Sequence, residues 1–289
     1  MKRFPFPAIL VSTLILALII GCNSESERSY NDSWADVENA GSGTITLHYV
    51  ASDGFSYTDD DGNLTGVTIE LMRDFADYVN NEYGADVSIH FNPIEQFSEF
   101  YNTVKEGGGG EFGVANVTIT EERREELEFS PPYMTNIATL ITHSDIDELD
   151  SFDDIPDQFQ NLKALAFEGT LHEDRLRNIK QEYLPDAKIE FAHSNNEIIE
   201  KTSMESRYFA YVDIYNYWRA SQADANLTRH SVGDESSEQF GVILPLESDW
   251  HGLMDEFFNQ GEGYIHSERY RELMETHLGR ELAELLLSQ

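Results

Sequence analysis

The feature that most constrains the fold is a repeated alternation of short β-rich runs with helical runs. Strands are predicted at residues 44–50, 87–91, 112–117, 137–142, 162–167, 188–192, 208–212 and 240–244. Helices are predicted at residues 68–83, 97–104, 172–183, 195–204, 215–225, 248–260 and 267–287. Strands that alternate with helices form mostly parallel sheets covered by helices. We therefore expect an α/β fold in two similar lobes, whose strand ends face each other across a cleft.

The first 21 residues form a separate segment. Lys2 and Arg3 precede an almost wholly apolar run over residues 9–20, a pattern typical of a secretory signal and short for a membrane span. The small residues before Cys22 resemble the lipobox of bacterial lipoproteins. That resemblance implies a lipoprotein signal peptide over residues 1–21 and a lipidated Cys22. A plain signal and an uncleaved anchor helix are the alternatives.

The segment over residues 22–43 is rich in Ser, Glu, Asn and Asp and has few large apolar residues. Such a stretch buries too little surface to order itself, so we expect a disordered tether between membrane and domain. Cys22 is the only cysteine of the chain, which excludes an internal disulfide. The remaining residues 44–289 are enough for one large or two modest domains.

The net charge of the chain limits the classes of partner that it can bind. Acidic residues number 54 against 19 basic ones, a formal net charge of −35, and loss of the signal would lower it to −37. Such a surface repels phosphates, so we expect no nucleic acid partner and membrane contact only through the lipid anchor. Because bases are scarce, an arginine inside a pocket would be informative.

The stretch over residues 114–133 carries the strongest local signal. A short apolar strand ends in the polar residues Asn116, Thr118 and Thr120, and a charged turn with Arg123 follows. Open α/β sheets bind ligands at the carboxyl ends of their strands, next to helix N-termini, and an arginine there can bind a carboxylate with two hydrogen bonds. The alternative is a surface helix capped by Thr120, with Arg123 as one more solvated charge.

Several motifs together resemble the bacterial extracellular solute-binding proteins of the amino-acid type, the periplasmic receptors of ABC importers. They are Asn-Val-Thr-Ile-Thr-Glu-Glu-Arg over residues 116–123, Phe129-Ser130, Pro132-Tyr133, Gly66-Val-Thr-Ile-Glu-Leu, Glu168-Gly169-Thr170, Phe240-Gly-Val-Ile, and Gly263-Tyr-Ile with Tyr270. The resemblance covers about residues 44–289. It implies a type II periplasmic-binding-protein fold with lobe 1 over residues 44–139 and 240–289, and lobe 2 over residues 140–239. Hinge crossings are expected near Ile137–Thr142 and Glu238–Gly241.

The resemblance also implies ligand contacts from lobe 1. Arg123 would bind the α-carboxylate of an amino acid with two parallel hydrogen bonds. Asn116 and Thr118 would supply polar contacts, and Phe97 would stack on the ligand. Phe97 could instead be an ordinary core residue.

Further contacts are implied from lobe 2. Thr170 and the main-chain N–H groups of Leu171 and His172 would complete the carboxylate site. Asp213 would pair with the α-ammonium group, although an Asp before a helix is also a common N-cap. His172 has the alternative of a loop histidine outside the site.

The chain departs from the family pattern after its first strand. Ser52-Asp53-Gly54-Phe55 lacks the first aromatic wall and keeps only Phe55 as a ligand contact. Asp53 would lie at the rim, facing a basic side chain. Leu171 stands where a small polar residue is usual. The aromatic residues near Tyr215 are predicted to be core and surface of lobe 2, with a stacking platform as the alternative.

The resulting hypothesis is an exported, monomeric, lipid-anchored binding protein that delivers an amino acid or similar zwitterion to an ABC permease. No catalytic residues and no cofactor are expected, and the nine histidines show no metal-binding spacing. One alternative is an enzyme of the same fold, similar to cyclohexadienyl dehydratase, with Glu168 or His172 as the acid. A sensory domain without transport is the other.

Overall fold

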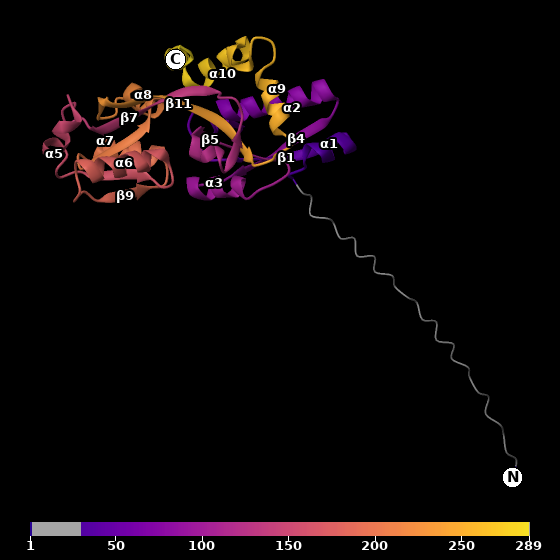
Figure 1. The fold of residues 1–289 in the computed structure, drawn as a ribbon, viewed down its shortest axis with the longest axis horizontal. Coiled ribbons are helices and arrows are strands. Elements are labelled where there is room, and N and C mark those ends of the chain that lie inside the picture. The colour runs from indigo at the N-terminus through magenta and orange to yellow at the C-terminus, as the bar shows by residue number, and fades with distance from the viewer. Residues whose placement is uncertain (2–29, 289) are drawn as a thin grey trace.

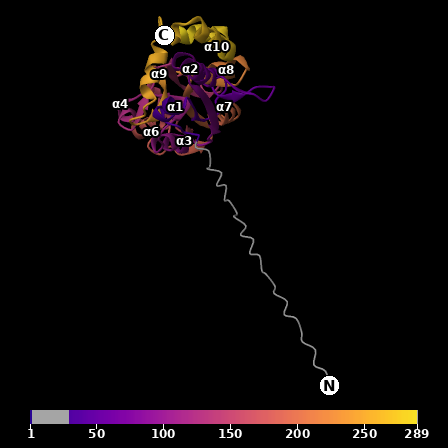
Figure 2. The ribbon, with the colours of Figure 1, turned by 90° about the vertical axis from the view of Figure 1, so that its right-hand side faces the viewer.

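The computed structural model describes Met1 and residues 30–288, so the predicted signal peptide and Cys22 lie outside the described part. Two α/β lobes lie side by side, and the C-terminal helices pack on one of them (Figure 1). A view turned by 90° shows α1, α2 and α9 at the end of the molecule formed by lobe 1 (Figure 2). The predicted α/β class with two lobes is what the structure contains.

Lobe 1 is built on three parallel strands in the order β4-β1-β5. These are β1 (Ser42–Tyr49), β4 (Asp86–Pro93) and β5 (Glu111–Thr118), and the main helices beside them are α2 (Val67–Tyr83), α3 (Phe97–Lys105) and α9 (His251–Phe258). The apolar positions of α2 are buried, as their helical spacing predicts. The helix ends at Gly84, whose φ of +66° suits glycine.

Lobe 2 repeats this plan with the parallel strands β10-β8-β9. These are β8 (Lys163–Phe167), β9 (Ile189–Ala192) and β10 (Tyr208–Asp213), and the helices are α6 (Leu171–Glu182), α7 (Asn195–Met204) and α8 (Ile214–Gln222). Every residue of β10 is buried, which explains its uninterrupted apolar sequence.

Two long antiparallel strands join the lobes. β7 (Met134–His143) and β11 (Leu227–Pro245) pair with each other, and they connect β5 of lobe 1 to β10 of lobe 2 in one continuous mixed sheet. The sequence prediction of a strand over residues 240–244 was too short, because the first half of β11 is polar and is interrupted by bulges. The polar side chains of that half do not show the apolar pattern from which a strand is predicted.

The segment before β1 corrects the predicted tether. Residues 34–40 form helix α1 (Trp34–Ala40), which Ser33 caps by accepting a hydrogen bond from the Asp36 N–H. Val37 is fully buried in the lobe 1 core, and Trp34 stacks edge-on against Trp250 at 5.4 Å. The predicted disorder over residues 22–43 is therefore wrong for its C-terminal part. The Asp249 carboxylate also accepts hydrogen bonds from the Trp34 and Ala35 N–H groups, each at 3.0 Å, so apolar burial and polar contacts together hold this short helix on lobe 1.

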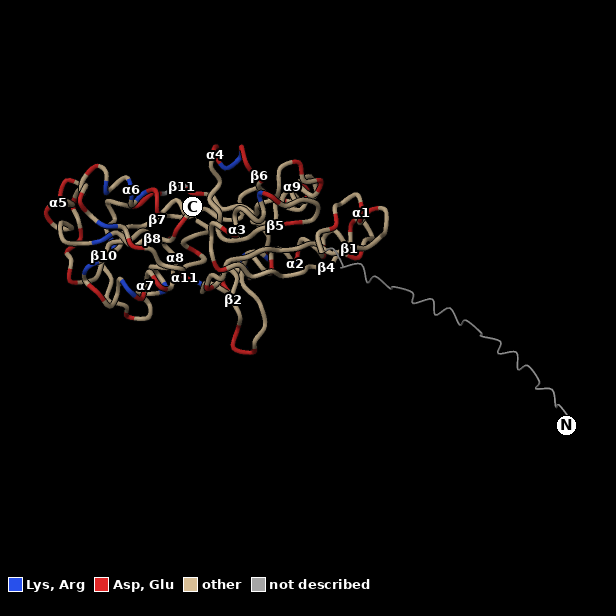
Figure 3. Tube along the Cα trace, turned by 90° about the horizontal axis from the view of Figure 1, so that it is seen from below, with Lys and Arg blue, Asp and Glu red and all other residues tan. Residues whose placement is uncertain are grey.

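The other elements are short or peripheral. They are β2 (Tyr57–Thr58), β3 (Leu64–Thr65), α4 (Glu121–Arg124), β6 (Leu127–Phe129), a 3-10 turn (Phe152–Asp154), α5 (Ile155–Gln158), a 3-10 turn (Tyr264–His266), α10 (Glu268–Leu278) and α11 (Arg280–Leu287). The single helix predicted over residues 267–287 is broken at Gly279, where φ is +84°. None of the helices in the described part is long and apolar enough to cross a membrane. Acidic residues are spread over both lobes (Figure 3).

Candidate ligand-binding site

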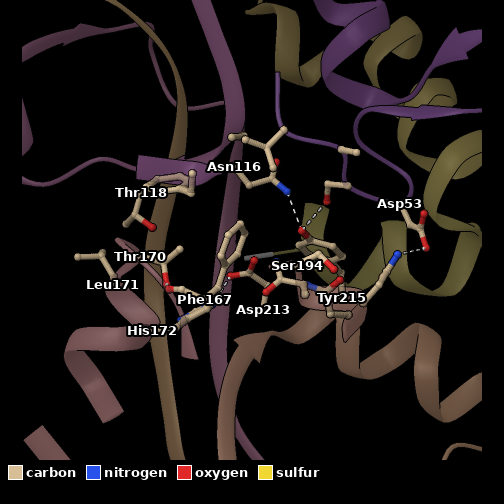
Figure 4. Close-up of a pocket in the computed structure, with 18 of the residues that line it drawn as sticks. Asp53, Asn116, Thr118, Phe167, Thr170, Leu171, His172, Ser194, Asp213 and Tyr215 are labelled. Atoms are coloured by element: carbon tan, nitrogen blue, oxygen red, sulfur yellow. Dashed lines mark hydrogen bonds and ion pairs between the residues drawn. The ribbon is translucent and has the colours of Figure 1, made fainter. Parts of the chain in front are cut away.

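A cavity lies between the lobes, at the carboxyl ends of β5 and β10 and the N-terminus of α6 (Figure 4). The space between its walls, including the solvent at its open mouth, is about 730 Å³. Eight of the nine predicted ligand contacts line it: Phe97, Asn116, Thr118, Arg123, Thr170, Leu171, His172 and Asp213. Residues far apart in sequence thus converge at one place, as the opposed strand ends predict.

Arg123 lies at one end of the cavity. Thr120 does cap α4, because its Oγ1 accepts a hydrogen bond from the Arg123 N–H at 3.1 Å. The guanidinium is nevertheless turned inward: its Nη1 donates to the Thr118 carbonyl at 3.0 Å, and its carbon lies 5.7 Å from the centre of the Phe97 ring. Burial lowers the pKa of Arg123. No carboxylate of the described residues pairs with it, so Nε and Nη2 are left to bind an anion.

The same end of the cavity offers further donors. Thr170 is the N-cap residue of α6, but its hydroxyl donates to the Phe167 carbonyl and leaves the helix uncapped. The main-chain N–H groups of Leu171 and His172 have no acceptor among the described residues. They point along the helix axis toward the cavity, where the helix dipole favours an anion. Arg123 and the α6 N-terminus together suit a carboxylate.

Asp213 ends β10 and lies deeper in the cavity, with 6% of its surface exposed. Its side chain does not cap α8, so the alternative role as an N-cap is not realised. One oxygen, Oδ1, accepts from Asn136 Nδ2 at 2.6 Å and lies 3.2 Å from His172 Nε2. The other oxygen, Oδ2, has no partner in the described chain, which leaves it available to a ligand cation.

His172 belongs to a closed circuit of buried side chains, here called the polar ring. Arg175 Nη1 donates to His172 Nδ1 at 3.1 Å, so Nδ1 carries no proton and Nε2–H donates to Asp213. Arg175 Nη2 also pairs with Glu238 Oε1, and Asn136 Nδ2 joins Glu238 Oε2 to Asp213. His172 is therefore a buried residue of the first turn of α6, which corrects the alternative of a loop histidine outside the site.

The ring connects the site to the strands between the lobes. Asn136 lies on β7 and Glu238 on β11, and the two are direct partners in the strand register. Both side chains are buried although both are polar. The Asp213 carboxylate, which lines the cavity, is thus linked through Asn136 to the two strands that join the lobes.

Asn116 has a different role from the one expected. Its φ is +52°, a left-handed conformation that Asn tolerates better than most residues. Its amide donates to the Tyr215 hydroxyl at 2.8 Å, and its Oδ1 accepts from the Tyr133 hydroxyl at 2.8 Å. Tyr215 also lies 3.0 Å from Ser52 Oγ. Asn116 lines the cavity, but its side chain holds Tyr215 in place across the cleft.

Phe55 requires a correction. It does not line the cavity, because its ring is buried against Tyr215 at a centroid distance of 4.6 Å. Tyr215, from α8, supplies the aromatic wall that the first loop lacks, and Phe55 supports it from behind. Phe97 is a core residue, as the alternative had it: its ring is buried and packs edge-on against Phe167 at 6.3 Å, and it also forms part of the cavity wall.

Asp53 lies at the rim and faces a basic side chain, as expected. Its Oδ2 lies 3.5 Å from Arg219 Nη2 and 3.3 Å from Asn196 Nδ2, both on lobe 2 helices. Glu168 is exposed and does not line the cavity. Sequence reasoning missed several lining residues, namely Ser52, Phe167, Ser194, Asn195, Asn196, Tyr215 and Asn216. For the residues from Ser194 to Asn196 and for Tyr215 and Asn216, the available signal was their position at the starts of α7 and α8; Phe167 ends β8 and Ser52 follows β1.

Comparison with known families decides the class of protein. The model of the bacterial extracellular solute-binding proteins, family 3, matches residues 47–279. The chain belongs to this family. Among related proteins, the amino-acid-binding protein AabA of Dichelobacter nodosus is 27% identical over 128 residues, which are 44% of this chain and 46% of that protein. The membrane-bound lytic murein transglycosylase F of Maricaulis maris is 25% identical over 180 residues, 62% of this chain and 37% of that protein. The chain thus spans less than half the length of either relative.

Solved structures confirm the predicted type II fold. A putative binding component of an ABC transporter from Wolinella succinogenes, complexed with lysine, has a TM-score of 0.66 at 16% identity, over 83% of this chain and 97% of that chain. An ancestral arginine-binding protein bound to arginine has a TM-score of 0.64 at 18% identity, over 82% of this chain and 98% of that chain. An ancestral amino acid-binding precursor of cyclohexadienyl dehydratase has a TM-score of 0.63 at 22% identity, over 84% of this chain and 98% of that chain. At these identities the likeness establishes the fold of this family 3 chain and leaves its ligand open.

Proposed function

We propose that this family 3 protein is an extracytoplasmic lipoprotein that captures a zwitterionic amino acid between its lobes and presents it to an ABC importer. One observation carries the proposal. A single cavity holds an arginine with free donors, Arg123, and a carboxylate with a free oxygen, Asp213. The α-carboxylate of an amino acid would pair with Arg123, and its α-ammonium group would pair with Asp213.

The physical reason is the cost of burying charge. An ion moved from water into a protein interior is destabilised unless an opposite charge and hydrogen bonds replace its hydration. A zwitterion offers both charges at a short fixed distance, whereas a simple acid or amine would leave one protein charge unpaired. The solved relatives complexed with arginine and lysine have the same fold, which supports this class of ligand.

Anchoring and closure belong to the same proposal. A signal over residues 1–21 and a lipid on Cys22 would place the domain outside the cytoplasm, with a shorter tether than expected because α1 already belongs to lobe 1. The hinge is proposed near Ile137–Thr142 and Glu238–Gly241, where β7 and β11 run between the lobes. Closure about such a hinge is a usual way to bury a ligand.

Titration calorimetry with refolded, ligand-stripped protein tests the proposal. At least one common amino acid should bind, and Arg123→Met should weaken that binding about 100-fold or more, because two charge-assisted hydrogen bonds contribute about 1.5–3 kcal/mol each. Arg124→Met is the matched control: Arg124 is exposed and does not line the cavity, so affinity should stay within about threefold. Absence of binding by every common amino acid would refute the assignment.

A sensory role without transport is the second candidate, and the similarity to murein transglycosylase F is the observation that favours it. That protein is not a transporter by its name, and this chain matches 37% of it. Reconstitution with a candidate ABC permease from the same genome would separate the two. Ligand-dependent stimulation of ATP hydrolysis supports transport, and its absence with a binding-competent protein supports sensing.

A further inference from the structure

The two charged groups at Arg123 and Asp213 leave one part of the cavity without an assigned role. Figure 4 places Thr118, Thr170 and Leu171 on one side of the cavity, and Tyr215 and Asp53 on the other. If the first side holds the α-carboxylate, the second side receives the ligand's side chain. This inference rests on the proposed function and concerns what that side chain is.

Two buried polar atoms in the cavity wall have no hydrogen-bond partner. They are the acceptor Asn195 Oδ1, at the start of α7, and the donor Asn216 Nδ2, in the first turn of α8. Asn216 is 7% exposed and lies beside the Tyr215 hydroxyl. That hydroxyl already accepts from Asn116 and bonds Ser52, and Asn216 Nδ2 makes no hydrogen bond of good geometry with it or with any other described residue.

Unpaired atoms of this kind are costly. A buried donor or acceptor without a partner destabilises a protein by about 1–3 kcal/mol, so native structures rarely keep one. Here an acceptor and a donor lie in the wall of the same cavity, on two helices that pack together. A ligand group that both donates and accepts would satisfy them at once.

The charges around the cavity restrict that group further. Arg123 and Asp213 are matched by the zwitterion, and both ring nitrogens of His172 are engaged by Arg175 and Asp213. The remaining charged lining residue, Asp53, is paired with Arg219 and bonded by Asn196. A cationic side chain would therefore meet Arg219 next to Asp53, and an anionic one would have no free cation.

We propose that the ligand is an amino acid whose side chain ends in an uncharged carboxamide, as in glutamine or asparagine. The amide NH₂ would donate to Asn195 Oδ1, and the amide oxygen would accept from Asn216 Nδ2. A carboxamide matches one acceptor and one donor, whereas an ammonium or guanidinium offers donors only and a carboxylate offers acceptors only.

Competition among free amino acids tests this without any mutation. Calorimetry on the ligand-stripped wild-type protein should show glutamine or asparagine binding at least tenfold more tightly than arginine, lysine and glutamate. Tighter binding of any of these charged amino acids overturns the inference and leaves the proposed function intact. Binding of no amino acid refutes the proposed function itself.

A variant pair locates the contact. Asn216→Asp replaces the donor by a carboxylate oxygen, so the affinity for the amide amino acid should fall at least tenfold while the affinity for alanine changes less than threefold. Asn81→Asp adds the same charge at an exposed position of α2 outside the cavity and should alter neither affinity. Because the new charge lies in the cavity, the measured quantity is the difference between the two ligands: a loss for alanine as large as the loss for the amide amino acid would mean that Asn216 is only structural, and the inference would fall.

Discussion

Replacement of Arg175 by methionine tests the polar ring most directly. The Arg175 side chain is 11% exposed and pairs with Glu238, which is 8% exposed, and with the more exposed Glu235 at 2.9 Å. Methionine keeps most of the apolar length of the side chain and removes all three of its polar contacts. Glu238 would then be a buried carboxylate without a cation.

The size of the effect follows from that burial. Removing one partner of a buried ion pair costs about 3–5 kcal/mol, mainly because the other charge stays buried and unpaired. Arg175→Met should lower the free energy of unfolding by that amount, since Asn136 alone remains bonded to Glu238. The double variant Arg175→Met/Glu238→Gln removes both charges and should recover at least half of the loss.

Urea unfolding followed by circular dichroism at pH 7 measures both variants, and calorimetry measures ligand affinity. In Arg175→Met the hydrogen bond that fixes the His172 tautomer is lost, so Asp213 is oriented less well and affinity should fall about tenfold. Two results would refute this description of the ring: a free energy of unfolding for Arg175→Met within 1 kcal/mol of wild type, or a lower value for Arg175→Met/Glu238→Gln than for Arg175→Met.

Two stability predictions concern other buried groups. Burial lowers the pKa of His230 to about 4, and its Nδ1 accepts from the Leu149 N–H, so the folded state resists protonation. The unfolded chain gains that proton below about pH 6.5, so the free energy of unfolding falls as the pH drops from 6.5 to 4. In urea titrations at pH 7 and pH 4, wild type should lose about 3 kcal/mol more of its free energy of unfolding than His230→Asn does. Val37→Ala should cost about 2 kcal/mol because two buried methyl groups are lost from α1, and an effect below 0.5 kcal/mol would show that α1 does not contribute to the core.

The sequence was sufficient for features that depend on local periodicity. The helical spacing of apolar residues located α2, and continuous apolar runs located β8 and β10 within a residue or two. The charged stretch around Arg123 was placed at the cavity because a strand end, a cap and an arginine occur in one short segment. Asp213 was assigned through the resemblance to the family, and it lies at the end of a buried strand.

Features that depend on contacts between distant segments were not predictable in this way. Tyr215 looks like one more aromatic residue of an amphipathic helix, and only the arrangement of the lobes brings it beside Asn116 and Ser52. Phe55 was assigned to the ligand by its position in a motif, but Tyr215 lies between it and the cavity. The polar ring was missed for the same reason, since its members come from four separate elements.

The division of contacts between lobes implies how the ligand would close the cleft. Asn116 with Tyr215, and Asp53 with Asn196, are protein contacts across the cleft that any ligand would find in the closed form. A ligand shifts the equilibrium toward closure only by the contacts that it makes in the closed form alone. A ligand held by Arg123 only would bind lobe 1 equally in both forms, and one held by Asp213 only would do the same with lobe 2. The proposed zwitterion would contact Arg123 on lobe 1 and Asp213 on lobe 2, so it would gain contacts in the closed form that neither lobe offers alone.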